Sequence, residues 1–280
     1  MHLDEDGGVV WDKNYGGTHC DWFDTVIQGL DGGYILTGNS SSGTSSYYDG
    51  NSWIVRLNED GSMDWERKDV IDAEFLKIAA SIEENYYYTV GTRQRTSGCS
   101  EDLWISKLDV DGSITWQKSF SNATCENRGS GIVLVQGGGC IAVGYQWNVS
   151  NANTFPIVRL DSAGETVWNY YISSDNGDEK TSNIILLPTG EYKGQYGIMS
   201  SGEGVLSDGY DSWLTIIDED GAVQQTVNFG APETDSMEIA ATSQDGGYIF
   251  WGYNTLTGNA QDFRIMKTDA DFSIDCEVLK

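Results

Sequence analysis

The sequence predicts an all-β fold, a β-propeller of five four-stranded blades, and three observations support this prediction. A nine-residue segment recurs as LDEDGGVVW (3–11), LNEDGSMDW (57–65), LDVDGSITW (108–116) and LDSAGETVW (160–168). Two further segments, DGGYILTG (31–38) and NSWIVRL (51–57), have related copies in the same phase. Short, evenly spaced strands with periodic glycine and aromatic residues, repeating about every 50 residues, are typical of propellers.

A glycine within the nine-residue segment sets the period. It recurs as Gly7, Gly61, Gly112, Gly164 and Gly221, and Phe272 takes the same position in the last copy. The successive spacings are 54, 51, 52, 57 and 51 residues. We expect the Asp-Gly pair to form a tight hairpin, because glycine adopts the positive φ of such a turn without a steric penalty.

The repeats divide the single domain, residues 1–280, into five units of four short strands. The units span approximately 9–58, 63–109, 114–161, 166–218 and 223–269, with a leftover strand at 273–279. A helix-like stretch at 72–85 falls where the period requires a strand, so it is predicted to be one. The sequence contains six copies of the hairpin but only five sets of the other strands. A propeller of six or more blades is therefore an alternative, if the chain is a fragment.

The tryptophan that follows each hairpin is predicted to pack between neighbouring blades. These residues are Trp11, Trp65, Trp116 and Trp168, and Gln225 and Cys276 replace them in the last two copies. An indole can bury up to about 200 Å² in such a position. The nine-residue segment is therefore interpreted first as architecture.

The repeat resembles a β-propeller-like repeat of secreted bacterial and archaeal proteins. The match lies in WDKNYGG (11–17), DGGYILTG (31–38) and SWIVRLNEDG (52–61), and related segments cover nearly all of the chain. The resemblance implies an extracellular or cell-surface module. The hairpin is also similar to the tryptophan-docking motif of quinoprotein dehydrogenases, which implies the packing role of the tryptophans. The quinone cofactor is not carried over, because the chain has five units and no adjacent cysteine pair.

The charge of the chain narrows the classes of partner. Asp and Glu number 43 against 16 Lys and Arg, which gives a net charge of −27. Such a surface repels nucleic acid and anionic lipid, and it suits cations, basic partners and neutral polar ligands such as sugars. No run of about 18 apolar residues is present, so no membrane insertion is expected.

The long connections between strands are predicted to lie on one face and to carry the function, since binding residues are often on loops held by a rigid scaffold. Their aromatic and acidic residues suit carbohydrate. The candidate ligand-binding residues are Trp22, Asp24, Tyr47, Tyr48, Asp49, Trp147, Asp208, Tyr210 and Asp211.

The favoured interpretation is a binding or adhesion module that recognises a glycan or an extracellular protein. One alternative is a carbohydrate-active hydrolase or lyase that uses carboxylates of this face, among them Asp21. The other is a structural repeat domain of a larger surface protein. The sequence names neither the catalytic residues of such an enzyme nor an oligomeric state.

No cofactor is predicted. The segments DVDG (109–112) and DEDG (218–221) resemble half of an EF-hand loop, but no copy has the glutamate that such a loop needs at its twelfth position. The hairpin explains these aspartates sufficiently, and only a weak Ca²⁺ site elsewhere on the acidic surface stays open.

The cysteines and the glycosylation sequons bear on the compartment. A Cys99–Cys125 disulfide is predicted, because both residues fall in adjacent loops of the same face, and it implies an oxidising compartment. Cys140 falls in a core strand and is expected to be buried, whereas Cys20 and Cys276 are left unpaired. Sequons occur at Asn39, Asn122 and Asn148. Glycans there would crowd the proposed face and favour the structural role.

Overall fold

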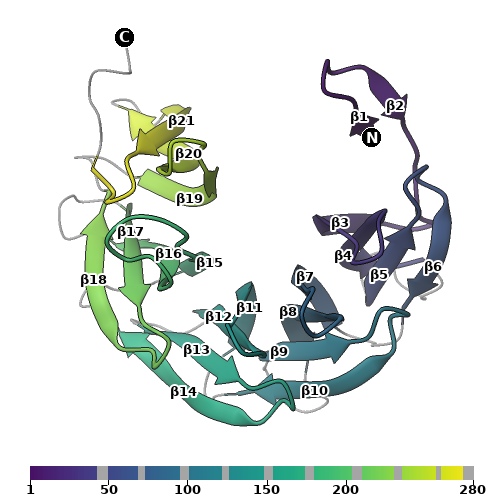
Figure 1. Cartoon of the computed structure of the whole chain (residues 1–280), viewed down its shortest axis with the longest axis horizontal. Coiled ribbons are helices and arrows are strands. Elements are labelled where there is room, and N and C mark those ends of the chain that lie inside the picture. The colour runs from purple at the N-terminus through teal and green to yellow at the C-terminus, as the bar shows by residue number, and fades with distance from the viewer. Residues whose placement is uncertain are drawn as a thin grey trace. The chain divides into compact units, whose positions relative to one another are not determined.

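The computed structural model describes residues 1–42, 50–68, 73–94, 101–121, 126–147, 154–173, 180–203, 210–229, 235–256 and 260–273. These residues form antiparallel β-sheets, which Figure 1 labels strand by strand. The predicted β-propeller of five blades is confirmed, with four strands in each of four blades and three described strands in the fifth. Within the described ranges, no helix is long and apolar enough to cross a membrane.

Five sheets make the blades. Blade 1 contains β3 (Asp21–Gln28), β4 (Tyr34–Ser40), β5 (Asn51–Leu57) and β6 (Met63–Arg67). Blade 2 contains β7 (Ala73–Ser81), β8 (Tyr86–Gln94), β9 (Glu101–Leu108) and β10 (Ile114–Phe120). Blade 3 contains β11 (Glu126–Leu134), β12 (Cys140–Trp147), β13 (Thr154–Leu160) and β14 (Thr166–Ser173). Blade 4 contains β15 (Lys180–Leu186), β16 (Tyr196–Glu203), β17 (Tyr210–Ile217) and β18 (Val223–Asn228). Blade 5 contains β19 (Asp235–Thr242), β20 (Tyr248–Leu256) and β21 (Ala260–Thr268).

The blades are offset by one strand from the sequence repeat. Each tryptophan strand, which opens a repeat unit, is the fourth strand of the preceding sheet, because the Asp-Gly hairpin pairs it with the strand before it. Among the described strands, the first copy, β2 (Val9–Trp11), pairs with β1 (His2–Leu3) alone, in a two-stranded sheet. The leftover strand predicted at 273–279 falls largely outside the described residues.

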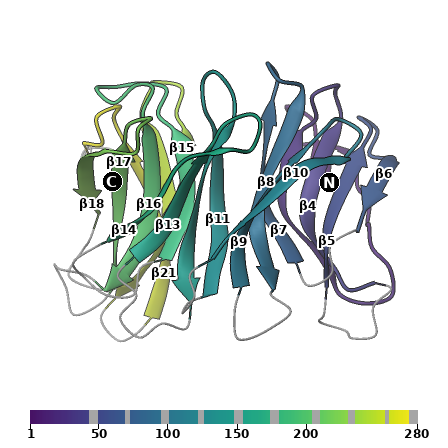
Figure 2. The ribbon, with the colours of Figure 1, turned by 90° about the horizontal axis from the view of Figure 1, so that it is seen from below.

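The chain divides into two compact units. Unit 1 contains Met1–Cys140 and Asp161–Glu165, and unit 2 contains Ile141–Leu160 and Thr166–Lys280. In each unit the short turns gather at one end of the strands (Figure 2). The helix-like stretch at 72–85 contains β7 followed by a turn, as the period requires.

The hairpin glycines adopt the predicted conformation, with φ of 75° at Gly61, 83° at Gly112 and 82° at Gly221. In a representative copy, the Gly112 amide donates to the Asp109 carbonyl and the Asp109 amide donates to the Ser113 carbonyl, both at 3.0 Å. The Asp109 Oδ1 atom accepts a further bond from the Ser113 amide at 2.8 Å. This aspartate therefore caps its own turn, a local use that needs no cation.

Each tryptophan that follows a hairpin packs on the hairpin of the next repeat. A Cβ added to Gly112 would lie 2.6 Å from the Trp65 ring, and one added to Gly164 would lie 2.7 Å from the Trp116 ring. The Trp11 indole packs on Gly61 in the same way and donates to the Glu59 carbonyl at 2.9 Å. The Trp168 indole donates to the Glu219 carbonyl at 3.2 Å, but a Cβ added to Gly221 would meet the Tyr170 ring instead. The outer strand of one blade is thus joined to the next blade by an aromatic side chain that packs on the hairpin glycine.

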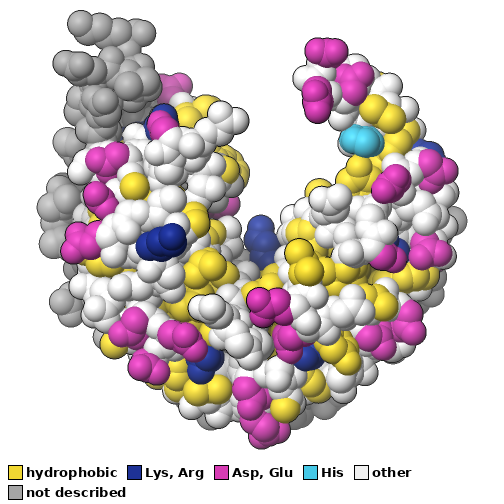
Figure 3. All heavy atoms as spheres, in the orientation of Figure 1, with side chains coloured by type: hydrophobic (Ala, Val, Ile, Leu, Met, Phe, Trp, Pro, Cys, Tyr) yellow, Lys and Arg dark blue, Asp and Glu magenta, His cyan; other side chains and the backbone are white. Residues whose placement is uncertain are grey.

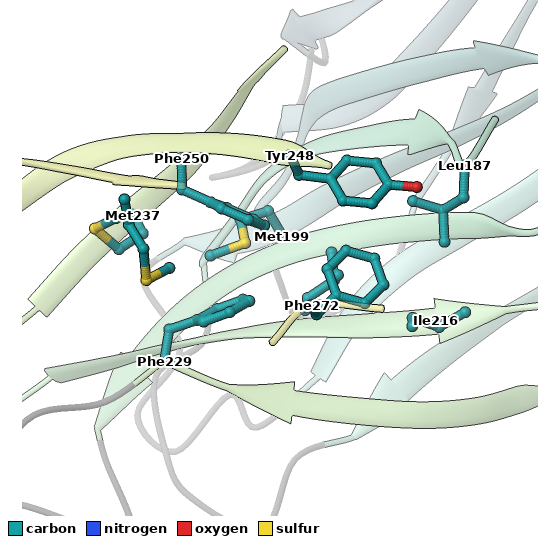
Figure 4. Packing of buried hydrophobic residues seen from close by; sticks show 10 residues of the cluster. Leu187, Met199, Ile216, Phe229, Met237, Tyr248, Phe250 and Phe272 are labelled. Carbon is teal, nitrogen blue, oxygen red and sulfur yellow. The ribbon is translucent and has the colours of Figure 1, made fainter. Parts of the chain in front are cut away.

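Neighbouring blades bury a shared apolar core. Between blades 1 and 2, Ile35 and Ile54 pack with Phe75, Tyr87 and Trp104. Between blades 4 and 5 the cluster is rich in methionine and aromatic side chains (Figure 4), and it contains Leu187, Met199, Leu214, Ile216, Phe229, Met237, Tyr248, Phe250, Met266 and Phe272. Strand alternation sends successive side chains of each central strand to opposite neighbours.

Candidate functional site in unit 1

Acidic side chains are spread over the face in view in both units (Figure 3), so charge alone does not locate a site. A more specific group lies in unit 1, at the strand ends opposite the short turns. We call it the inner-strand cluster, and it consists of Trp22 and Asp24 on β3, Glu74 and Lys77 on β7, Glu101 on β9 and Arg128 on β11.

The fold brings these residues together because β3 and β11 both contact β7. The Thr25 hydroxyl on β3 donates to the Leu76 carbonyl on β7 at 2.8 Å, which fixes the two strands side by side. Asp24 lies at a β-bulge, where the pairing of β3 with β4 shifts between Phe23 and Thr25. Bulges commonly redirect a side chain beside a functional site.

Two carboxyls of the cluster hold protons more tightly than usual. Partial burial raises the pKa of Asp24, which is still accessible to solvent, against the opposing effects of the Lys77 charge and a hydrogen bond from the Trp22 indole. Burial also raises the pKa of Glu74, and the neighbouring negative charge of Asp24 raises it further. Arg128 acts in the opposite direction on Glu74. Three carboxyls face only two cations here, so retaining a proton relieves like-charge repulsion.

Arg128 holds Glu101 at two points. Its Nη2 atom donates to Glu101 Oε1 at 3.1 Å, and its Nε atom donates to Glu101 Oε2. This fork fixes the guanidinium plane, as two-point pairs with carboxylates do. Arg128 therefore presents a positioned cation beside Glu74 rather than a mobile one.

Trp22 gives the cluster an exposed aromatic surface, with 38% of the residue accessible. A protonated carboxyl donates a hydrogen bond, an ionised one accepts, and an indole provides an apolar plane. The arrangement suits a neutral ligand that has both hydroxyl groups and an apolar face.

The structure places the predicted ligand-binding residues unevenly. Trp22 and Asp24 belong to the cluster. Tyr47, Tyr48, Asp49 and Asp208 lie outside the described residues, and so do Cys99 and Cys125 of the predicted disulfide. Trp147 ends β12 and Tyr210 begins β17. Cys20 and Cys140 carry free thiols, and Cys140 is buried as expected.

Three expectations need correction. Asp211 is fully buried within β17, so it is not a surface ligand; its segment is strand rather than loop. Asn39 is 2% exposed within β4, which leaves no room for a glycan in the folded blade. Asp21 accepts bonds from the Gly17 amide at 2.7 Å and the hydroxyls of Ser42 and Ser40, so it holds the segment before β3. Asn122 and Asn148 lie outside the described ranges.

The pKa of Asp21 is lowered, whereas those of Asp24 and Glu74 in the cluster are raised. Burial acts to raise the pKa of Asp21, but the hydrogen bonds from Ser40, Gly17 and Ser42 outweigh it and lower that pKa. Asp21 stays ionised and structural. Among the described residues, no group of three or more His, Cys, Asp or Glu side chains is placed to hold a metal ion.

Glu74, Glu101 and Arg128 were not among the predicted residues. Two repeat periods separate Asp24 from Arg128, so an alignment of the repeats puts both near the start of an inner strand. That signal was present in the sequence. The pairing of Glu74 with Asp24 requires the packing of β7 against β3, which no local pattern encodes.

Comparisons with known proteins agree on the fold. Prolyl oligopeptidase B from Galerina marginata has a TM-score of 0.50 at 12% identity, over 89% of this chain and 32% of that one. The β-propeller domain of the Trilobed protease from Pyrococcus furiosus has a TM-score of 0.49 at 10% identity, over 89% and 68%. A GH43 β-1,3-galactosidase has a TM-score of 0.47 at 13% identity, over 95% and 58%.

The chain thus spans little more than half of the galactosidase and about a third of the oligopeptidase. No protein-family model matches the sequence, and no curated protein sequence matches it. The β-propeller is shown by the sheets of the chain itself, and these likenesses, at 10 to 13% identity, bear on the fold alone.

Proposed function

We propose that the chain is an extracellular or cell-surface module that binds neutral glycans at the inner-strand cluster. The observation that carries the proposal is the exposed Trp22 indole beside Asp24 and Glu74, two carboxyls whose pKa values are raised. The indole stacks on the apolar face of a sugar ring, and the carboxyls and Arg128 hydrogen-bond its hydroxyls.

The test is retention by a panel of neutral polysaccharides in affinity electrophoresis. Trp22→Ala is expected to abolish retention by the glycan that binds. Trp251→Ala is the matched control, because Trp251 is also exposed, at 43%, but lies on β20 in unit 2. Absence of retention by every polysaccharide, or equal loss in both variants, would overturn the proposal.

The pH dependence tests the role of the protonated carboxyls. If Glu74 donates a hydrogen bond to the ligand, affinity is expected to fall as the pH rises through its raised pKa. Glu74→Gln keeps a donor at this position at every pH, so its affinity is expected to fall less than that of wild type, with only the titration of Asp24 left to change it. A wild-type affinity that does not change with pH would exclude Glu74 as a donor.

A second candidate is a carbohydrate-active enzyme, favoured by the same observation. Glycoside hydrolysis commonly uses two carboxyls, one of which has a raised pKa and donates a proton to the leaving group. Incubation of the retained glycan with the protein distinguishes the two functions. Product that accumulates with wild type and is lost in both Asp24→Asn and Glu74→Gln would favour the enzyme, and intact glycan would favour the binding module.

A further inference from the structure

Among the residues that the structure describes, six aspartates in turns are each followed by a glycine. They are Asp6, Asp31, Asp60, Asp111, Asp220 and Asp245. An Asp-Gly pair can rearrange with no reagent other than water, because glycine has no side chain to hinder attack of its amide nitrogen on the neighbouring carboxyl carbon. All six aspartates are exposed, so exposure alone does not tell which of them react.

Asp60 and Asp111 are held by the serine that follows the glycine. Asp60 Oδ1 accepts a hydrogen bond from the Ser62 amide at 2.8 Å and another from the Ser62 hydroxyl at 2.6 Å. Asp111 Oδ1 accepts one from the Ser113 amide at 3.1 Å. The bonds from Ser62 lower the pKa of Asp60. Bonds from Asp109 and Ser113 lower the pKa of Asp111 in the same way, because they favour the ionised carboxyl.

Asp31 and Asp245 are held by cations. The Arg56 guanidinium donates to Asp31 Oδ1, and the Lys267 ammonium donates to Asp245 Oδ2. The bonds from Lys267 and from the Ser243 hydroxyl lower the pKa of Asp245. A carboxylate that is bound to a cation or to hydrogen-bond donors is held away from its own main chain and is a poor electrophile. We therefore expect these four aspartates to be protected from rearrangement.

Asp6 and Asp220 differ from the other four. Within the part of the chain that the structure describes, their carboxylates take part in no hydrogen bond or ion pair. The residue after the glycine is Gly8 in the first turn and Ala222 in the second, and neither has a hydroxyl. The amides of these two residues donate to the first aspartate of their own turn, at 2.6 and 2.9 Å. The second aspartate is thus left without a donor.

We propose that Asp220 and Asp6 are sites of spontaneous isomerisation to isoaspartate. The glycine amide nitrogen attacks the carbon of the neutral carboxyl, a C–N bond forms, and the carboxyl OH leaves as water together with the amide proton. Water then opens the resulting succinimide at either of its carbonyl carbons. One opening restores aspartate, and the other leaves the main chain running through the side-chain carbonyl, which is isoaspartate. The second step returns the water that the first released, so no oxidant or reductant is consumed.

Isomerisation in the turn at 218–222 has a consequence for packing. The Gly221 amide donates to the Asp218 carbonyl at 3.0 Å, which closes the turn. The Trp168 indole donates to the Glu219 carbonyl at 3.2 Å, and the Tyr170 hydroxyl donates to the Gly221 carbonyl. Isoaspartate adds one carbon atom to the main chain between these two carbonyls. Both aromatic side chains of the preceding outer strand would then lose acceptors that are correctly placed for them.

The test is a peptide map of the folded protein after prolonged warm incubation below its unfolding temperature. Isoaspartate has the same mass as aspartate, so it is identified by electron-transfer fragmentation of the separated peptides. It is expected at positions 220 and 6, and to form several-fold more slowly at positions 60 and 111. The same incubation in urea is expected to make the four positions react alike, because the unfolded chain lacks the hydrogen bonds that distinguish them.

Two substitutions exchange the environments of a reactive and a protected aspartate. Ala222→Ser recreates at 218–222 the serine of the turn at 109–113, and it is expected to slow isomerisation of Asp220 about fivefold, the net worth of one hydrogen bond. Ser62→Ala removes the hydroxyl that holds Asp60 and is expected to speed isomerisation there by a similar factor. In each variant the unaltered turn is the internal control. Circular dichroism checks that both variants are folded.

Three results would overturn the proposal. Equal accumulation of isoaspartate at positions 220, 6, 60 and 111 of the folded protein would show that the serine bonds do not control the reaction. Absence of isoaspartate at position 220 in the folded protein, together with its formation in urea, would show that the folded turn itself prevents the attack. An unchanged rate in Ala222→Ser would exclude the missing hydroxyl as the reason why Asp220 reacts.

Discussion

The hairpins at 109–113 and 269–273 both contain a residue with positive φ, but they differ in how an aromatic ring packs at that residue. The first uses glycine, with φ of 83° at Gly112, and the Trp65 indole of the preceding outer strand packs on it. The second has Phe272 at the same position, with φ of 65°. Its ring is 5% exposed and stacks on Tyr248 at 4.7 Å between centroids (Figure 4).

Phenylalanine stands in place of glycine at position 272 because the outer strand before this hairpin lacks the usual tryptophan. Gln225 replaces it on β18, so the preceding outer strand offers no indole to this hairpin. The turn after β15 approaches the hairpin instead, and the Glu191 amide donates to Asp271 Oδ1 at 2.9 Å. Phe272 supplies from within the hairpin the aromatic contact that Trp65 supplies from outside. The burial of the Phe272 ring thus offsets the backbone strain of its positive φ.

Replacing Phe272 is expected to have the largest effect on stability. Phe272→Ala removes a buried aromatic ring and keeps the positive φ, so it is expected to lower the free energy of unfolding by about 4 kcal/mol. Phe272→Gly loses the same ring but relieves the strain, so it is expected to be about 1 kcal/mol more stable than Phe272→Ala. Urea denaturation measures both. Equal stability of the two variants would mean that the backbone here carries no strain.

Adding a methyl group beneath an indole is expected to rank second. Gly112→Ala combines a positive φ with a Cβ 2.6 Å from the Trp65 ring, and it is expected to cost about 3 kcal/mol. Gly7→Ala is the control, since Gly7 has φ of 80° but no atom within 4 Å of the added Cβ. It is expected to cost about 1 kcal/mol. Similar losses in both variants would remove the packing part of the explanation.

The smallest expected effect is the coupling energy of a double-mutant cycle, which separates the contribution of the Trp65 indole from that of the Gly112 turn. Trp65→Ala is expected to cost about 2 kcal/mol, and in its presence Gly112→Ala should cost only the backbone strain. The two changes are therefore expected to be less than additive, with a coupling of about 2 kcal/mol. Additive losses in urea denaturation would show that Trp65 does not rest on Gly112 in solution.

The sequence predicts the hairpins and strands because their causes are local. An Asp-Gly pair selects its turn, and alternation selects a strand, even at 73–81 where the composition favours helix. The sequence does not predict how the strands group into blades. Each tryptophan strand has a neighbouring strand on either side in the sequence, and it could share a sheet with either one. Only the hydrogen bonds of β6 with β5 decide between these groupings.

The candidate site is predicted only in part for a related reason. Trp22 and Asp24 stand out as an aromatic beside a carboxylate. Glu74 acquires its raised pKa from burial and from the Asp24 charge on the neighbouring blade, which no single segment contains. Asp211 looks equally suitable in the sequence, and only its burial in β17 separates it from Asp24.

The docking of each indole on the next hairpin has a consequence for synthesis of the chain. Trp65 must wait for Gly112, 47 residues later, before its ring is covered. Ribosomes add roughly 5 to 20 residues per second, so the wait lasts about 2 to 9 s. Throughout translation, the newest outer strand displays an aromatic side chain that the following repeat will cover. The growing chain thus exposes an apolar aromatic surface on its newest outer strand, where chaperones or neighbouring nascent chains can bind.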